Sequence, residues 1–350
     1  MKALVSVSPN VIEYWDVEKP VAEKNMVLIK VSKAGLCATD FSIYTGESSF
    51  VENGSIQYPV RFGHEWSGTV EAVGEDVVGF QVGDRVVSDS GFSCGICETC
   101  KAGDLINCPH IKSVGTVNTW DGCFAEYMFV PDYHLYKLPE SVSLTEGALI
   151  EPTTISYDAF TDAGDITGKT VVVMGTGAIG MSSAWLAKYL GAKTVVMVGR
   201  TESKLEVAKK IGADMTINTK TEDVVEAVMK LTGGMGADMV IETSGSGQLL
   251  IDSFTVTKRY GRVSVLSFYE RNLNDIPMDN VVLQCLTVRG AAGCMGYPRK
   301  VIDIMKDNPI KLTPIITDTV PFEEGIKVFK DMANYKKKNI KIILDMDGEA

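Results

Sequence analysis

The chain has 350 residues, of which 45% are hydrophobic and 23% are charged, an ordinary composition for a globular protein. This length suits two domains better than a single core. The 45 acidic and 34 basic residues give a net charge of −11, which argues against nucleic-acid and membrane partners. The N-terminus lacks the apolar core of a signal peptide, and no apolar run is long enough to span a bilayer. We therefore expect a cytoplasmic protein.

The first part of the chain predicts short strands separated by turns. Apolar or alternating runs cover 1–7, 26–34 and 67–73, and a Gly-Asp-Arg turn at 83–85 introduces a further strand. Short strands at this spacing, with glycines between them, are typical of a β-barrel or sandwich. Two long loops, 35–66 and 88–122, interrupt the pattern and carry most of the cysteine and histidine motifs.

The second part predicts an alternating α/β fold that begins near 151–170. Helical segments separate the predicted strands, and this alternation favours a doubly wound parallel sheet. Beyond 291 the remaining elements are too few for a domain, so we expect them to return to the first one. We assign 1–153 and 291–350 to one domain and 154–290 to the other. The predicted strands of the sheet are 170–174, 194–198, 215–217, 239–242, 261–266 and 286–290, and the tail elements are 298–306, 312–320, 322–332 and 340–345.

A glycine-rich turn follows the strand at 170–174 and opens a helix-length apolar-periodic segment. It has the pattern Gly-x-Gly-x-x-Gly, in the order strand, turn, helix that a dinucleotide site requires. The first glycine permits the tight turn, the second lets the backbone approach a pyrophosphate, and the third lets the helix pack on the strand. We therefore expect the cofactor to be bound by Gly175, Gly177, Ala178, Ile179 and Gly180.

Four of the eight cysteines, Cys94, Cys97, Cys100 and Cys108, lie within fifteen residues. This is metal-ligand spacing rather than a disulfide framework in a chain of this size. Four thiolates close a tetrahedral shell around zinc and leave no position for a substrate, which is typical of a structural site. We expect this loop to be held together by zinc and to take no part in chemistry.

A second set of candidate ligands is dispersed along the chain: Cys37, His64, Glu65 and Glu151. Each lies beside a glycine or a proline at the end of a predicted element. A thiolate, an imidazole and a carboxylate are ligands of the kind found at catalytic zinc, where one position stays open. Taken singly, Cys37 also fits a buried core position, His64 a core histidine and Glu151 a helix cap.

In this order, these motifs resemble the zinc-dependent medium-chain dehydrogenases, and most closely the polyol (sorbitol-type) branch. The resemblance rests on 35–40, 63–65, 83–86, the four-cysteine loop, Glu151-Pro152 and 175–180, and it covers essentially the whole chain. It implies a GroES-like β-barrel catalytic domain, a Rossmann cofactor domain, an active site in the cleft between them, and a homodimer or homotetramer.

The resemblance also implies roles for individual residues. Cys37, His64 and Glu65 would bind a catalytic zinc, with Glu151 as a fourth or alternating ligand, and the four-cysteine loop would bind a second zinc. Thr39 would pass the substrate proton outward, and Asp40 would orient the ligand histidine. The implied reaction transfers a hydride between an alcohol, or its ketone, and a nicotinamide cofactor.

Three departures from the family pattern limit this transfer. Ser42 replaces the relay histidine of many alcohol-active members, and the segment 289–294 lacks the arginine–tyrosine pair of the animal sorbitol enzymes. Gly199 replaces the aspartate that NAD-dependent relatives use for the ribose, and Arg200 follows it. A guanidinium without a neighbouring carboxylate favours the 2′-phosphate of NADP, and Lys204 could assist it. Arg200 and Lys204 also fit a solvated surface, in which case the enzyme would use NAD.

Other residues receive structural interpretations. Cys123, Cys285 and Cys294 fit packing positions, and His110 and His134 stand in no recognisable ligand spacing. Trp66 and Trp120 fit the core or the wall of a substrate pocket. The lysines at 336–338 fit a solvated turn.

The leading hypothesis is a zinc-dependent secondary-alcohol or polyol dehydrogenase using NADP(H), or NAD(H) if Arg200 is not a determinant. The alternatives are a threonine- or butanediol-type dehydrogenase and a polyol-phosphate dehydrogenase, although no phosphate-binding arginine cluster supports the latter. A nucleotide-binding structural or sensor protein is a different class, and the presence of Cys37, His64 and Glu65 argues against it.

Overall fold

The computed structural model describes residues 1–293, 295–331 and 339–348, and it divides into two compact units. The first unit comprises Met1–Glu151, Cys294–Asp307 and Ile316–Ala350, and the second comprises Pro152–Gly293 and Asn308–Ile315. The segment 308–315, which we assigned to the first domain, therefore belongs to the second. One reason is a contact within that unit, where the indole N–H of Trp185 donates to the Ile310 carbonyl at 2.6 Å.

The second unit contains one six-stranded sheet with the order β13-β12-β11-β14-β15-β16, in which every pairing is parallel. This confirms the predicted doubly wound sheet. The central strand β11 is an unbroken apolar run from Val171 to Met174 that is buried on both faces, as interior parallel strands are. The strands are β11 (Thr170–Met174), β12 (Thr194–Gly199), β13 (Met215–Asn218), β14 (Ala237–Glu242), β15 (Thr257–Val265) and β16 (Thr287–Gly290).

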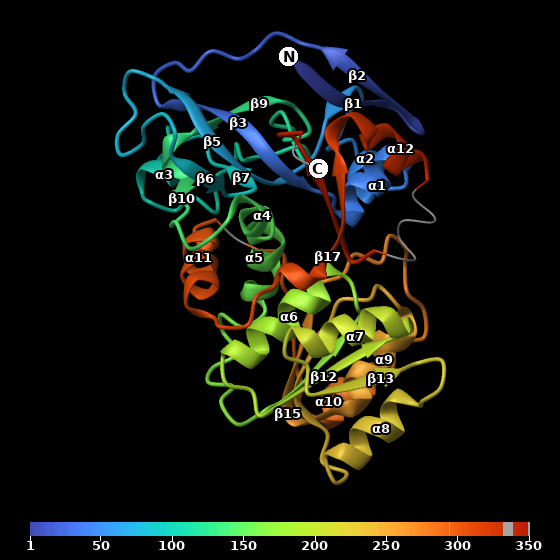
Figure 1. Cartoon of the computed structure of the whole chain (residues 1–350). Coiled ribbons are helices and arrows are strands. Elements are labelled where there is room, and N and C mark those ends of the chain that lie inside the picture. The colour runs from blue at the N-terminus through green and yellow to red at the C-terminus, as the bar shows by residue number, and fades with distance from the viewer. Residues whose placement is uncertain (294, 332–338, 349–350) are drawn as a thin grey trace. The chain divides into compact units, whose positions relative to one another are not determined.

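Helices connect these strands and pack along the sheet (Figure 1). Helices were predicted near 155–163, after the glycine-rich turn, and near 222–231 and 248–257. No range was predicted for α7 or α10, and the six residues of α10 are too few to show a helical period. The helices are α5 (Ile150–Asp158), α6 (Ala178–Tyr189), α7 (Glu202–Lys210), α8 (Val224–Leu231), α9 (Gly247–Val256) and α10 (Met278–Leu283), with the 3-10 turn η2 (Thr313–Ile315).

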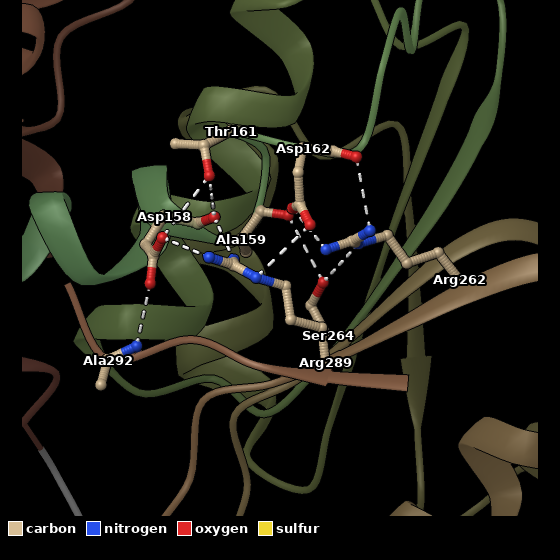
Figure 2. Close-up of polar contacts among 8 residues, drawn as sticks. All are labelled: Asp158, Ala159, Thr161, Asp162, Arg262, Ser264, Arg289 and Ala292. Carbon is tan, nitrogen blue, oxygen red and sulfur yellow. Dashed lines mark hydrogen bonds and ion pairs between the residues drawn. The ribbon is translucent and has the colours of Figure 1, made fainter. Parts of the chain in front are cut away.

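Two arginines fasten the end of helix α5 to the sheet edge (Figure 2). Arg289 on β16 donates to the Asp158 carboxylate at 2.9 Å and to the Asp158 carbonyl at 2.7 Å. Arg262 on β15 pairs with Asp162 at 2.5 Å. The second Asp158 oxygen accepts the backbone N–H of Ala292 at 3.1 Å, so one carboxylate joins the helix end to the segment that follows β16.

The first unit is built mainly from antiparallel strands, in sheets of seven, three and two. The seven-stranded sheet has the order β10-β6-β5-β3-β18-β17, with β9 also paired to β3. The strands are β1 (Lys2–Ser8), β2 (Val11–Asp16), β3 (Met26–Gly35), β4 (Val60–Arg61), β5 (Glu65–Val73), β6 (Arg85–Ser88), β7 (Gly91–Phe92), β8 (Lys112–Ser113), β9 (Tyr127–Pro131), β10 (Leu135–Lys137), β17 (Ile316–Pro321) and β18 (Lys341–Asp345).

The C-terminal strands β17 and β18 complete this sheet, because β18 pairs with the end of β3. These two strands of the tail thus lie in the same sheet as strands from the beginning of the chain. The short helices of the unit are α1 (Ala38–Thr45), α2 (Ser49–Glu52), α3 (Glu98–Lys101), α4 (Leu144–Gly147), α11 (Tyr297–Asp307) and α12 (Gly325–Lys330), with the 3-10 turns η1 (Asp132–His134) and η3 (Phe322–Glu324). Among the described helices, none has both the length and the hydropathy needed to cross a bilayer.

Helices α1 and α2 lie in the region 35–66 that we predicted as a loop. Helix α1 mixes polar and apolar residues without a clear face, so its sequence carries little helical periodicity. It is started instead by a local contact, in which the carboxylate of Asp40 accepts the backbone N–H of Cys37 at 2.8 Å. This helix sets the position of the first candidate metal ligand.

Most residues that received structural interpretations occupy packing positions. Trp66 and Cys123 are buried, and Trp120 packs against the core of the first unit with its indole N–H on the Phe129 carbonyl at 3.0 Å. Cys285 is exposed, so its predicted packing role is wrong. Cys294 and the lysines at 336–338 lie outside the described residues.

Candidate metal centres and nucleotide site

The four cysteines of the loop at 94–108 converge on one point. Their sulfurs lie within 4.8 Å of one another, and the Cys94–Cys100 and Cys97–Cys108 pairs are 3.9 Å apart. Sulfurs bound tetrahedrally to zinc at about 2.3 Å are about 3.8 Å apart, so these distances fit a zinc ion. The cysteine cluster has the donor set and the spacing of a structural zinc site.

Backbone amides also point at these sulfurs. The N–H groups of Cys97 and Cys94 approach Cys94 Sγ and Cys108 Sγ at 3.4 Å. Hydrogen bonds from the backbone amides of Ile96 and Cys97 lower the pKa of Cys94 to about 6. A thiol held in this way is easily converted to the thiolate that binds zinc.

The second group brings Cys37, His64 and Glu65 together, as the sequence analysis predicted. One ligand atom from each lies within 4.8 Å of the others. The register of the sheet explains this, because Gly35 at the end of β3 pairs with Glu65 at the start of β5. Cys37 follows β3 by two residues and His64 immediately precedes β5, so the three side chains gather at one edge of the sheet.

Asp40 lies behind His64 as the family pattern implied. Its Oδ1 is 3.6 Å from His64 Nδ1, and both atoms are buried without a hydrogen-bond partner among the described residues. Burial opposes the charge of His64, but the carboxylate of Asp40 and the thiol of Cys37 outweigh it and raise its pKa well above the ordinary value. Surroundings that hold a proton so firmly favour a cation, and a metal ion competes for the same site. The donor set therefore fits a zinc ion.

The structure adds one residue that the sequence analysis missed. Lys341 on β18 is buried and forms an ion pair with the carboxylate of Glu65. Its ammonium also donates to the carbonyl of Leu36 at 2.9 Å. No motif marks this lysine, and it lies 276 residues from its partner, so only the pairing of β18 with β3 brings it to the site.

Glu151 lies close to this group without being part of the three-residue cluster. Its carboxylate interacts electrostatically with His64 and Glu65 and accepts a hydrogen bond from Ser90. Burial, together with the charge of Glu65, raises the pKa of Glu151 to about 7, although the charge of His64 opposes the rise. Glu151 is thus a buried carboxylate poised between its protonated and ionised forms near neutral pH.

Thr39 and Ser42 both lie on α1, directly after Cys37. Thr39 is partly exposed. The hydroxyl of Ser42 lies 3.2 Å from the carbonyls of Ala38 and Thr39, to which it donates. Of these two hydroxyls, that of Ser42 is bonded to the helix backbone. Among the described residues, no such bond engages the hydroxyl of Thr39.

The glycine-rich turn follows β11 and begins helix α6. A Cβ added to Gly180 would lie 1.9 Å from the Gly175 carbonyl oxygen, so the helix and the strand approach too closely for any side chain there. A Cβ added to Gly177 would meet nothing within 4 Å. The turn therefore leaves open space at the N-terminus of α6, with Ala178 and Ile179 in its first turn. This is the arrangement that accommodates a pyrophosphate.

The end of β12 carries two cations in place of an acid. Arg200 is exposed, and Lys204 is about half-buried on α7. Burial and then the charge of Arg200 lower the pKa of Lys204, which places the two cations near each other. Because Lys204 is about half-buried, it does not lie on a fully solvated face. A side chain at Gly199 would strike Thr176, because an added Cβ lies 2.3 Å from Thr176 Cγ2.

His134, for which the sequence offered no partners, is fully enclosed. Its Nδ1 lies 2.9 Å from the Asp89 carboxylate, and its Nε2 accepts the backbone N–H of Ser93 at 2.9 Å. This contact anchors the residue that precedes Cys94 and so supports the cysteine loop. His110 is exposed, although its backbone N–H approaches Cys108 Sγ at 3.4 Å.

Comparison with known proteins places this geometry in a family. Residues 23–140 match the alcohol dehydrogenase GroES-like domain, and residues 178–307 match the zinc-binding dehydrogenase family. The chain is 35% identical to L-threonine 3-dehydrogenase of Pyrococcus horikoshii over 91% of this chain and 90% of the relative. It is 28% identical to sorbitol dehydrogenase of Bacillus subtilis over 98% of this chain and 97% of the relative.

Among solved structures, a zinc-binding dehydrogenase from Sinorhizobium meliloti 1021 bound to NADP superimposes with a TM-score of 0.88 at 27% identity. The match covers 99% of both chains. The fold is thus a GroES-like domain with a Rossmann-type domain. The chain belongs to the zinc-dependent medium-chain dehydrogenases and is an enzyme of their alcohol and polyol dehydrogenase class.

Proposed function

We propose that this enzyme transfers a hydride between NADP(H) and a secondary alcohol that carries a second polar group on the neighbouring carbon. The observation that carries the proposal is the convergence of Cys37, His64 and Glu65 at one edge of the sheet. One thiolate, one imidazole and one carboxylate leave a ligand position open, as catalytic zinc sites do.

In this proposal Cys37, His64 and Glu65 hold the catalytic metal, and Glu151 is a fourth or alternating ligand. The bound zinc supplies the Lewis acidity that lets an alcohol lose its proton near neutral pH. Asp40 keeps the His64 ring oriented from behind. Thr39 accepts the substrate proton and passes it toward solvent, a role that its partial exposure supports.

The preference for NADP(H) rests on the end of β12. Gly199 provides no carboxylate to repel a 2′-phosphate, while Arg200 and the neighbouring Lys204 provide two cations. The pyrophosphate would lie over the open turn at Gly177. NAD(H) is the second candidate, because the same turn accepts either dinucleotide.

The substrate class rests on the relatives. Threonine and sorbitol, the compounds named for two of them, both carry a secondary hydroxyl next to another polar carbon. We therefore place amino alcohols, diols and polyols ahead of simple alcohols. We further propose a homodimer or homotetramer, and a reducing compartment such as the cytoplasm, where the four thiols that bind zinc stay reduced.

A spectrophotometric screen tests substrate and cofactor together. Polyols, inositols, diols and amino alcohols are each offered with NADP and NAD. The reduced cofactor is measured by the near-ultraviolet absorbance of its nicotinamide ring, which reports hydride transfer. We expect turnover with a vicinal amino alcohol, diol or polyol and a higher kcat/KM with NADP. Turnover confined to simple primary alcohols would contradict the substrate proposal.

The cofactor proposal has its own variant, which replaces Gly199 with Asp and Arg200 with Ser. Because a side chain at 199 strikes Thr176, the variant also carries Thr176→Ala, and Thr176→Ala alone is the matched control. We expect the kcat/KM ratio of NADP to NAD to fall by at least about tenfold, equivalent to about 1.4 kcal/mol. An unchanged ratio would show that Arg200 is not a determinant.

A further inference from the structure

The most enclosed ion pair at the candidate metal centre joins Lys341 to Glu65. Their side chains are 2% and 1% exposed, and they come from strands at opposite ends of the chain. Two charges this far from water persist together only when each compensates the other. The pair is therefore a built feature of the site, unlike exposed ion pairs such as Lys101–Glu98.

The contact involves one particular oxygen of the carboxylate. Lys341 Nζ donates to Glu65 Oε2, and a Cβ added to Gly35 would lie 2.3 Å from the same atom. Oε2 is therefore enclosed between the ammonium and the backbone of β3. The Leu36 carbonyl accepts a second hydrogen bond from Lys341 at 2.9 Å, which fixes the ammonium on that side.

We propose that Lys341 is a positioning residue that shares Glu65 with the catalytic metal. By holding Oε2, it leaves Glu65 one oxygen to offer as a ligand and prevents the carboxylate from occupying two positions. The position kept open is the one that a substrate oxygen requires. This inference rests on the proposed catalytic metal site and adds a residue that controls it.

The charges around the site support this role. Besides the paired carboxylate of Glu65, the thiol of Cys37 and the carboxylate of Glu151 lie close enough to interact with the ammonium of Lys341. A fixed cation beside a carboxylate ligand competes with a metal ion for that ligand, because both are bound by the same negative charge.

Two substitutions with opposite expected effects test the proposal. Lys341→Met keeps the length and apolar character of the side chain but removes the competing charge. Lys341→Arg keeps the charge and offers a fork that can take both carboxylate oxygens. Lys33→Met is the control, because Lys33 on β3 forms a largely buried ion pair with Asp345 on β18, the strand that carries Lys341, and this pair does not involve Glu65.

The measurements are zinc retention against a chelator and the visible spectrum of Co²⁺-substituted protein, which reports the number and kind of ligands. At the catalytic site we expect zinc affinity to rise by about tenfold in Lys341→Met, because the competing cation is removed. We expect it to fall by about tenfold in Lys341→Arg, the lower end of the usual loss when a partner of a metal ligand is changed. The Co²⁺ spectrum should change in both variants and stay unchanged in Lys33→Met.

Lys341→Met that binds the catalytic metal no more tightly than the parent, with an unchanged Co²⁺ spectrum, overturns the proposal. If Lys341→Met does not fold, Lys341→Arg decides alone, and unchanged affinity there overturns it. A parent protein that binds only the cysteine-loop zinc would instead refute the proposed catalytic site itself. The two failures are therefore distinguishable.

Discussion

The two metal centres of the first unit are assembled in different ways. The cysteine cluster lies within fifteen residues, and short turns and the single-turn helix α3 bring its sulfurs together. The cluster of Cys37, His64 and Glu65 requires two strands to pair, and its partner Lys341 comes from a third strand near the C-terminus. The first centre is a local structure, whereas the second exists only when the sheet is complete.

This difference indicates that the cysteine cluster serves stability and that the centre of Cys37, His64 and Glu65 serves chemistry. A local cluster with four sulfur ligands is saturated, so it can fix a loop but cannot bind a substrate. A centre built at the edge of a sheet has fewer ligands and charged neighbours such as Lys341 and Glu151, which provide ways to adjust it.

Removing a ligand of the assembled centre, formed by Cys37, His64 and Glu65, should abolish catalysis. The local centre, formed by the four-cysteine loop, should keep its zinc. We expect Cys37→Ser and His64→Ala to lose turnover by several orders of magnitude, because the proposed metal loses one of three protein ligands. Activity assays, metal analysis and cofactor titration measure the effect. One zinc per chain should remain, with the fold and cofactor binding retained.

The exposed Cys285 provides the control for these ligand variants. Cys285→Ser should keep full activity and both zinc ions. Loss of the cysteine-loop zinc in His64→Ala would show that the two centres are coupled, contrary to the distinction drawn here.

Removing a ligand of the local centre should release the structural zinc and lower stability, while the assembled centre is retained. In Cys97→Ser we expect loss of the structural zinc and a free energy of unfolding lowered by several kcal/mol, because structural zinc contributes directly to folding. Chemical denaturation and metal analysis test this. The Co²⁺ spectrum of the catalytic centre should persist at low temperature, and its disappearance would contradict the prediction.

The assembled centre should also be sensitive to a backbone position that provides no ligand. A methyl group at Gly35 would lie 2.3 Å from Glu65 Oε2, so Gly35→Ala should displace the carboxylate and cost about 1–3 kcal/mol of stability. The affinity of the catalytic centre for zinc should fall as well, as measured by chelator competition.

Gly91→Ala is the control for this substitution, because its nearest contact would be an ordinary one at 3.4 Å from Ile111. Equal zinc affinity and stability in the two variants would show that Gly35 has no special role beside Glu65.

The sequence could predict the local features well. The spacing of the four cysteines and the glycine-rich turn after β11 are complete within short segments, and the six strands of the second unit follow from apolar runs separated by helical segments. Cys37, His64 and Glu65 were predicted as ligands through family resemblance, since their separation in the chain does not bring them together. The register of β3 with β5 provides the physical reason that they meet.

Other features could not be predicted because they depend on tertiary contacts. Lys341 is an ordinary lysine at the start of a short apolar strand until β18 pairs with β3 and buries it against Glu65. The buried pair of His134 and Asp89 also depends on tertiary structure, because the pairing of β10 with β6 brings the residues next to these strands together. The segment 308–315 joins the second unit through Trp185, a contact that the local sequence does not reveal.

The smallest expected effect concerns the pH dependence of stability at the assembled centre. Burial raises the pKa of Glu151 from 4.5 to about 7 in the folded chain. Between these values the folded state binds more protons than the unfolded state, so the free energy of unfolding should fall as pH rises through this window. The contribution is at most about 3 kcal/mol.

Glu151→Gln should remove this part of the pH dependence, because an amide does not titrate. Denaturation at several pH values between 4.5 and 8, on protein whose catalytic metal has been removed by a chelator, compares the variant with its parent. At the higher pH the variant should be the more stable of the two, since it buries no ionised carboxylate. Parallel pH profiles for the two proteins would mean that Glu151 ionises as an ordinary surface acid, and the carboxylate would then be too well solvated to serve as an alternating ligand.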